Sequence, residues 1–493
     1  MGLSRREFLS MGSAFLAGTS FGQQVSMAAS ITPRKRNIVF VLTDDLRYDA
    51  ISAFGNSFYQ TPNLDALARA SAYFDNAFVT TSLCSPSRAS ILTGCYAHVH
   101  GVMNNSTPLP STLPTFPRLL QKQGYETAFI GKWHMGGHSD APRPGFDHWV
   151  SFRGQGHYAN QTLNVDGQSV EKSGYLTDVL TDYAIDFLQK SHDRPFMLYL
   201  SHKAVHADFD TLDRFQGRFD GASYPYPDSM ADTEVNYKGK PDWVKRQRDS
   251  WHGVDGLYNK TRDLDTVVRQ TAETVLGLDE NMGRLASALR EEGLLEDTLL
   301  VFTADNGFMF GEHGLIDKRA MYEPSIRVPL FVHCPSLIPE PRRIEEMVLN
   351  IDFAPTFLEI AGAAIPDSMQ GRSFLKVLTQ REQNWREDFL YEYFWERAFP
   401  QTPTVLGVRT NRYKFMQYHG IWDHYELYDL EKDPHEMNNL IGEFMVETEG
   451  GALDRLIAHR APDPVKSIYL DLSERLKRLL NETGCAPEPD WRP

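Results

Sequence analysis

Two continuous apolar stretches, each ending abruptly in acidic residues, constrain the fold of this chain most. Residues 37–45 are NIVFVLTDD and residues 298–306 are TLLVFTADN. Runs of β-branched and aromatic residues without polar alternation are typical of strands buried on both faces of a parallel sheet. We therefore predict two central strands that carry charged residues at their carboxyl ends.

Helical patterns alternate with these and other predicted strands. Helices are predicted within 61–74, 112–123, 177–190 and 269–293, and strands within 125–131 and 195–201. This alternation favours an α/β fold with a large mixed, mostly parallel sheet sandwiched by helices. Because open α/β sheets place their binding crevice at the carboxyl ends of the strands, we expect four strand ends to converge there. Those ends carry Asp44, Lys132, His202 with His206, and Asp305 with Asn306.

The composition and the hydrophobic pattern of the chain change twice after residue 207. Residues 208–265 are rich in Tyr, Pro, Asp and Trp, which favours a long surface insertion able to wall a substrate pocket. From about residue 376 the pattern alternates as in antiparallel strands, and residues 469–482 form a late helical pattern. We predict a catalytic domain over 37–375 and a small C-terminal α+β subdomain with an antiparallel sheet over 376–493.

The N-terminus and the overall charge bear on location and partners. Arg5 and Arg6 precede Phe8-Leu9 and a short, weakly apolar run, a pattern typical of a twin-arginine signal peptide over 1–30; a disordered basic tail is the alternative. We expect export by the twin-arginine translocase to the periplasm or beyond, without a permanent membrane span. With 65 acidic and 50 basic residues, and thus a formal charge of -15, we expect no nucleic-acid partner.

Four cysteines lie scattered along the 493 residues, with no C-x-x-C pair, at positions 84, 95, 334 and 485. A protein that folds before export is not expected to depend on disulfides. Cys334 follows the apolar run VPLFVH and is interpreted as a core thiol. Cys84 stands in TTSLCSPSRASILTG, a small polar loop followed by a helix-like run that Gly94 closes. Core packing, metal binding, disulfide formation and attack on a substrate are the four alternative roles for a thiol there. This stretch alone does not distinguish among them.

Acidic and amide side chains at two strand ends suggest a metal site. Asp44-Asp45 and Asp305-Asn306 supply oxygen ligands, which suit Ca²⁺ or Mg²⁺ better than zinc. Adjacent buried carboxylates repel each other and need a cation. One such pair alone is more often a helix cap or a solvated turn, whereas two pairs at neighbouring strand ends favour a metal.

Beyond these patterns, the chain resembles the sulfatases of the alkaline phosphatase superfamily from about residue 37 to 440. The resemblance rests on strings that occur in the family's order: VLTDDLR, CSPSRASILTG, GKWHMG, HKAVHAD, TADNG, DKRAMYEPSIRVPL and ELYDLEKDPHEMNNL. It implies an alkaline phosphatase-like fold and hydrolysis of a sulfate ester.

The resemblance also implies a modified nucleophile. In the family, the cysteine of Cys-x-Pro-x-Arg is oxidised to formylglycine by a maturation enzyme, which points to Cys84. One hydroxyl of the hydrated aldehyde attacks the sulfate ester, and the second allows release of inorganic sulfate. The implied cation is Ca²⁺, with Mg²⁺ as the alternative. Its implied ligands are Asp44, Asp45, the modified Cys84, Asp305 and Asn306.

Further roles are implied for the charged residues of the same strings. Arg88 would hold the formylglycine hydroxyl, while Lys132 and His134 would contact the sulfate and the second hydroxyl, with His134 as the base. His206 and Lys318 would bind the sulfate and protonate or stabilise the departing oxygen. We interpret His202 as a supporting residue.

The substrate is indicated only by class. Many relatives have Gly-Gly after the Tyr-Glu of the lysine string, whereas this chain has Pro324 and Ser325, and residues 144–167 resemble N-acetylglucosamine-6-sulfatase-like members. We therefore expect a sulfated mono- or oligosaccharide, with His157 and Tyr158 either contacting the sugar or packing at the surface. The alternatives are a phosphonate or phosphate monoester hydrolase, and a non-catalytic glycan-binding relative. The last would have lost a residue of these strings, and none is lost.

Overall fold

The computed structural model describes residues 35–379, 384–421, 425–444 and 460–485. The chain from Lys35 onward forms one compact unit. The predicted signal peptide, residues 1–30, lies outside the described residues. Within the described residues, no helix is both long and apolar enough to cross a membrane.

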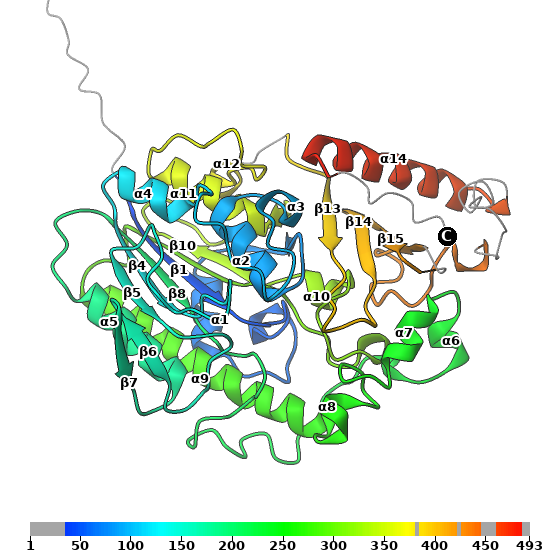
Figure 1. The fold of residues 1–493 in the computed structure, drawn as a ribbon, viewed down its shortest axis with the longest axis horizontal. Helices are drawn as coiled ribbons and strands as arrows, with labels where there is room; N and C mark the ends of the chain where they lie inside the picture. The colour runs from blue at the N-terminus through cyan, green and yellow to red at the C-terminus, as the bar shows by residue number, and fades with distance from the viewer. Residues whose placement is uncertain (1–34, 380–383, 422–424, 445–459, 486–493) are drawn as a thin grey trace, which may run out of the picture. The chain divides into compact units, whose positions relative to one another are not determined.

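A ten-stranded mixed sheet forms the centre of the molecule (Figure 1). Its middle consists of five neighbouring parallel strands, in the order β9 (Thr298–Ala304), β1 (Asn37–Thr43), β8 (Phe196–Ser201), β4 (Glu126–Gly131) and β5 (His148–Ser151). Beyond β9 lie β10 (Leu330–His333), β2 (Ala72–Phe74) and β11 (Arg342–Ile344), and beyond β5 lie β6 (Thr162–Val165) and β7 (Gln168–Glu171). The predicted mixed, mostly parallel sheet is confirmed.

Helices cover both faces of this sheet (Figure 1). One layer contains α1 (Pro62–Arg69), α5 (Leu176–Leu188) and α9 (Leu264–Glu291), and the other contains α2 (Cys84–Thr93), α4 (Phe116–Lys122), α11 (Phe353–Ile360) and α12 (Leu375–Thr379). Phe40 of β1 packs on Phe353 and Phe357 of α11, with ring centroids 5.2 and 5.3 Å apart. Burial on both faces explains the continuous apolar sequence of β1.

Two helix boundaries differ from the sequence-based prediction. The helix expected over 61–74 ends at Arg69, and Ala72–Phe74 form strand β2 instead, paired with β10 and β11. Tyr73 and Phe74 suit a pleated strand with partners on both sides, and this long-range pairing overrides the local helical pattern. Helix α9 begins at Leu264, where the Asp263 side chain accepts a hydrogen bond from the Thr266 amide at 2.8 Å.

The predicted C-terminal antiparallel sheet is present. It contains β13 (Asp388–Tyr393), β14 (Thr404–Thr410), β15 (Tyr413–His419) and β16 (Tyr425–Asp429), and helix α14 (Val465–Thr483) packs against it. The domain boundary near residue 376 stays a prediction.

The segment 208–265 is irregular, as predicted, with only short helices: α6 (Glu234–Tyr237), α7 (Asp242–Gln247) and α8 (Leu257–Lys260). Other short elements are β3 (Ala77–Phe78), which pairs with β12 (Val348–Leu349), α3 (Ala97–His100), which contacts α2, and α10 (Glu323–Ile326). The 3-10 turns are Ser52–Phe54, Asp228–Met230, Glu312–Gly314, Asn350–Asp352 and Gly442–Phe444.

Candidate active site

The parallel register brings the charged strand ends together. Thr43 of β1 lies opposite Ala304 of β9, so Asp44 and Asp305 leave the sheet side by side. The amide of His202 donates to the carbonyl oxygen of Leu42 at 2.8 Å. The Lys132 amide donates in the same way to Ser201, also at 2.8 Å. The expected convergence of four strand ends is confirmed.

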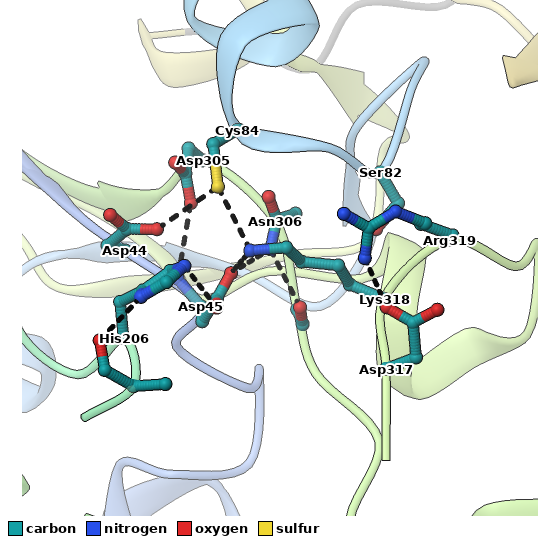
Figure 2. Close-up of polar contacts among 12 residues, drawn as sticks. Asp44, Asp45, Ser82, Cys84, His206, Asp305, Asn306, Asp317, Lys318 and Arg319 are labelled. Atoms are coloured by element: carbon teal, nitrogen blue, oxygen red, sulfur yellow. Dashed lines mark hydrogen bonds and ion pairs between the residues drawn. The ribbon is translucent and has the colours of Figure 1, made fainter. Parts of the chain in front are cut away.

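Asp44, Asp45, Asp305 and Asn306 form a buried group that we call the oxygen cluster (Figure 2). Ligand oxygens of the three aspartates all lie within 4.8 Å of one another. The Asn306 amide nitrogen donates to Asp45 Oδ1 at 2.6 Å, while Asn306 Oδ1 is buried without a hydrogen-bond partner. Asp45 adopts a left-handed backbone with φ of 59°. A strained residue beside an unsatisfied oxygen marks a site built for a ligand rather than for stability.

The electrostatics of the oxygen cluster fit a cation. Burial and the charge of Asp44 raise the pKa of the Asp305 carboxyl to about 7. Burial also raises the pKa of Asp45, against the attraction of Lys318. The pKa of Asp44 is held well below its usual value, against the effect of burial, by Lys132, His206 and Arg88. Three crowded carboxylates and a free amide oxygen are ligands that a hard divalent cation prefers.

Cys84 is the first residue of α2, and the sequence-based placement in a polar loop is wrong at this position. Its Sγ lies 3.5 Å from Asp44 Oδ1 and 2.9 Å from Lys318 Nζ, at the centre of the site (Figure 2). Burial and the charge of Asp44 raise the pKa of the Cys84 thiol to about 12. The unmodified side chain is therefore a poor nucleophile near neutral pH.

The cysteines behave as expected in other respects. All four are buried and none is joined to another by a disulfide, while the expected independence of disulfides stays a prediction. Cys334 is only 1% exposed and belongs to the apolar core, which confirms its interpretation as a core thiol.

Arg88 lies one turn after Cys84 on the same helix and is 1% exposed. Its Nε donates to Asp305 Oδ2 at 2.8 Å. Its Nη1 donates to the carbonyl oxygen of Lys132 and to Ser201 Oγ, both at 2.7 Å. The guanidinium thus joins the ends of β9, β4 and β8, and it shields the oxygen cluster from one side.

Two buried lysines supply positive charge. Lys132 Nζ pairs with Asp44 and with the amide oxygen of Gln155, and Lys318 Nζ pairs with Asp45. Although burial opposes it, Asp45 and Cys84 raise the pKa of Lys318, so its ammonium stays protonated. Local positive charge is thus concentrated in a chain that is acidic overall.

The three histidines take different places. His206 Nδ1 donates to the carbonyl oxygen of Ala207 at 2.7 Å, which leaves Nε2 facing Asp45 Oδ2 at 3.7 Å. His134, with φ of 61°, has its Nδ1 3.4 Å from the hydroxyl of Ser85. Burial and the charge of Lys132 lower the pKa of both rings well below 6.5. His202 is fully buried, and neither of its ring nitrogens has a hydrogen-bond partner.

Tyr158 is packed rather than free at the surface. It is 1% exposed, and its hydroxyl donates to the carbonyl oxygen of His206 at 2.8 Å. Its ring stacks on Tyr175 at 5.3 Å. Of the two alternatives for this residue, packing is the one observed, and Tyr158 supports the position of His206. His157 is exposed.

Several site residues escaped the sequence analysis. Gln155 and Ser201 contact Lys132 and Arg88, and neither stands out in its local sequence. Asp317 and Arg319 flank Lys318 and form a buried ion pair at 2.8 Å on the side away from Cys84 (Figure 2). Their signal was available, since the consecutive charges of DKR occur in a string already singled out.

Comparison with known proteins agrees with this geometry. The family model described as Sulfatase matches residues 36–363, well over half of the chain. The chain belongs to the sulfatase family. A second model, N-sulphoglucosamine sulphohydrolase, C-terminal, matches residues 311–458 of this sulfatase.

Named relatives of this sulfatase cover most of its length. The N-acetylglucosamine-6-O-sulfatase of Bacteroides thetaiotaomicron is 34% identical over 481 residues, covering 85% of this chain and 86% of the relative. The human N-acetylglucosamine-6-sulfatase is 32% identical over 403 residues, covering 76% and 70% of the two chains.

Solved structures resemble the sulfatase along nearly all of its length. A structure in complex with its substrate D-glucosamine-2-N,6-O-disulfate has a TM-score of 0.83 and 30% identity, covering 93% of this chain and all of that one. The phosphonate monoester hydrolase of Agrobacterium radiobacter has a TM-score of 0.72 at 20% identity, covering 91% and 96%, and so shares the fold.

This sulfatase is therefore a sulfuric ester hydrolase that acts on a sulfated carbohydrate. Family membership implies a metal ion, for which the three aspartates of the oxygen cluster are the candidate ligands. The roles of the individual residues stay predictions.

Proposed function

We propose that this sulfatase removes the 6-sulfate of a sulfated glucosamine residue, with formylglycine made from Cys84 as nucleophile and Ca²⁺ at the oxygen cluster. The substrate proposal is supported by the activity after which the relatives are named and by the substrate in the similar solved structure. The proposal on the nucleophile is carried by one observation: Cys84 Sγ lies between Asp44 Oδ1, at 3.5 Å, and Lys318 Nζ, at 2.9 Å.

The oxygen cluster and the modified Cys84 would hold the cation. Bound there, a divalent cation offsets the charge of the sulfate and makes the nucleophilic hydroxyl more acidic. Arg88 holds Asp305 and the end of β4, so that the nucleophile and the ligands keep a fixed geometry.

The surrounding side chains divide the work of binding and proton transfer. The ammonium groups of Lys132 and Lys318 attract the sulfate oxygens and stabilise charge that develops as the ester bond breaks. His134 is neutral and accepts the proton of the second hydroxyl when sulfate is released. Because Nδ1 of the neutral His206 ring donates to Ala207, its Nε2 is unprotonated and would accept a hydrogen bond or a proton in the site. The protonated ammonium of Lys318 is then the group that stabilises or protonates the departing oxygen.

The proposed location follows from the N-terminus. The Arg5-Arg6 string supports export through the twin-arginine translocase to the periplasm or beyond. Under this proposal the maturation enzyme modifies Cys84 before the chain folds, since the mature thiol is fully buried.

The deciding experiment measures both the product and the modification. The enzyme, produced with a formylglycine-generating enzyme, should release inorganic sulfate from glucosamine-6-sulfate, and mass spectrometry of the Cys84 peptide should find the aldehyde. Cys84→Ala should abolish release, whereas Cys334→Ala, the matched control in another buried thiol, should retain it. An unmodified thiol in active enzyme would overturn the proposal.

A paired assay separates the alternative within the same fold. A phosphonate or phosphate monoester hydrolase would turn over p-nitrophenyl phosphate much faster than p-nitrophenyl sulfate. We expect the reverse order. A non-catalytic glycan-binding protein would bind the sugar and release nothing from either ester.

A further inference from the structure

Trp251, Tyr258 and Phe399 form a surface feature beside the active site that we call the aromatic ledge. Trp251 is 43% exposed, which is high for so large an apolar side chain. Its ring centroid lies 4.6 Å from that of Tyr258 and 6.4 Å from that of Phe399. The ledge therefore combines two segments distant in sequence, the insertion 208–265 and the connection between β13 and β14.

Backbone hydrogen bonds fix the ledge next to Lys318. The amide of Ile316 donates to the carbonyl oxygen of His252 at 2.7 Å, and the amide of Val254 donates to Gly314 at 3.0 Å. The intervening pair, Gly253 and Leu315, forms an antiparallel bridge. Trp251 therefore begins a short stretch that runs alongside the residues immediately before Asp317 and Lys318.

Side chains make a second connection through the residues that flank Lys318. The guanidinium carbon of Arg319 lies 3.7 Å from the centroid of the Phe399 ring. His252 stacks on the same ring at 4.7 Å, and its Nδ1 lies 3.7 Å from Asp317 Oδ2. The ledge thus stands on the Asp317–Arg319 ion pair, which Figure 2 shows on the side of Lys318 away from Cys84.

The ledge includes a stretch of strained backbone at Tyr258. Tyr258, Asn259 and Lys260 are all left-handed, with φ of 46°, 60° and 61°. Three consecutive non-glycine residues in this region are costly, and such strain concentrates at ligand-binding sites.

The chemistry of the surroundings selects the occupant. A sugar ring presents apolar C–H faces and hydroxyl edges, so it needs an exposed aromatic plane with hydrogen-bonding groups next to it. The ledge offers the exposed Trp251 ring with the half-buried rings of Tyr258 and His252 beside it, each at 4.6 Å between ring centroids. The buried Asp317–Arg319 ion pair lies beneath and supports them. Among the described large apolar side chains with high exposure, the two tryptophans, Trp251 and Trp395, both lie on the segments that form the ledge.

We propose that the aromatic ledge binds the sugar residue that is glycosidically linked to the sulfated sugar, so that this sulfatase prefers an oligosaccharide to the free sulfated monosaccharide. The inference rests on the proposed function for the position of the sulfate. It adds a second subsite, with Trp251 as its outermost contact.

The test compares kcat/KM for three substrates: p-nitrophenyl sulfate, glucosamine-6-sulfate, and a disaccharide that contains the same 6-sulfated residue. The native enzyme should favour the disaccharide over the monosaccharide. Trp251→Ala should lower kcat/KM for the disaccharide roughly tenfold, the usual size of a lost aromatic contact, and far less for the two small substrates. Trp251→Phe should keep most of the preference. Leu470→Ala, on the exposed face of α14 at 47% exposure, is the control and should change nothing.

The outcomes separate the inference from the proposed function. Equal losses on all three substrates in Trp251→Ala would overturn the inference, because the residue would then only support the Lys318 segment. A native enzyme without preference for the disaccharide would overturn it as well. If no substrate releases sulfate, the proposed function fails, and binding of the unsulfated disaccharide still tests the ledge. That sugar should quench tryptophan fluorescence in the native protein and much less in Trp251→Phe, and equal quenching would overturn the inference.

Discussion

Replacing Lys414 by methionine tests how the C-terminal sheet holds the segment that carries Lys318. Lys414 lies in β15 with no exposed side-chain surface. Its ammonium donates to the carbonyl oxygen of Met321 at 2.6 Å, and it pairs with Glu436 at 2.7 Å and Glu323 at 2.9 Å. Because Met321 and Glu323 follow Lys318 closely, this one ammonium joins the segment that carries Lys318 to the C-terminal part of the chain.

The expected cost follows from the charges that remain. Removing one partner of a buried ion pair costs about 3–5 kcal/mol, because the other charge stays buried. Glu323 keeps its pair with Arg409 at 3.2 Å, whereas Glu436 loses its cation. Burial, against the attraction of Lys414, already raises the pKa of Glu436 to about 7. Without Lys414 this carboxyl takes up a proton near neutral pH, so we expect a loss near the lower limit, about 3 kcal/mol.

Urea denaturation at pH 7 measures this loss, and two further variants make it interpretable. The double variant of Lys414→Met with Glu436→Gln should recover at least half of the stability, because glutamine removes the cost of protonating a buried carboxyl at pH 7. Lys238→Met is the control, since Lys238 is 70% exposed and pairs with an exposed glutamate. It should change the free energy of unfolding by less than about 1 kcal/mol. If Lys414→Met unfolds at the same urea concentration as this control, the argument from buried charge is refuted.

Three other outcomes are expected. Gly131→Ala should destabilise the fold by roughly 3 kcal/mol or more, because φ is 126° and the new Cβ would lie 1.8 Å from a carbonyl oxygen of β8. Gly55→Ala is the control for backbone strain alone, since φ is 117° and the space around the new Cβ is open. An equal loss of thermal stability in both variants would refute the steric argument. His98 stabilises the fold in its charged form, because hydrogen bonds with Cys485 and Glu392 raise its pKa to about 10 against the effect of burial. The difference in Tm between the native enzyme and His98→Gln should therefore be largest below pH 6.5 and vanish as the pH rises through 10. A difference in Tm that does not change with pH would contradict this. After treatment with a chelator, added Ca²⁺ or Mg²⁺ should raise the Tm of the protein by relieving repulsion in the oxygen cluster. An unchanged Tm with both cations would exclude a metal there.

The strand ends were predictable because their signal is local. A continuous apolar run marks a strand buried on both faces, and the position of its first charged residue marks the edge of the sheet. Asp44, Lys132 and Asp305 each sit at such a transition, and parallel pairing then brings them together without further information. For this reason the oxygen cluster could be predicted from the sequence.

The misses have a common physical cause, which is dependence on partners far along the chain. Residues 72–74 become a strand only because β10 and β11 accept them. Ser201 matters because Arg88, 113 residues earlier, donates to it. Tyr158 is buried, and its hydroxyl donates a hydrogen bond to the carbonyl oxygen of His206, 48 residues later. Local periodicity does not depend on these contacts. The sequence alone therefore did not decide whether Tyr158 contacts a sugar or packs against the protein.

The proposed chemistry and the proposed sugar preference lie in different parts of the chain, and Lys318, with the residues just before it, is in contact with both parts. Its ammonium contacts Cys84 and Asp45, which are fixed by α2 and by the end of β1. Its own segment is fixed from elsewhere, by the hydrogen bonds of residues 252–254 on one side and by Lys414 on the other. With the proposed ledge as a subsite, changes in the insertion or in the β13–β14 connection would alter the contacts of the substrate. They would leave in place the oxygen cluster, which sheet register and Arg88 hold. Such an arrangement lets substrate preference change while the chemistry of ester cleavage is kept.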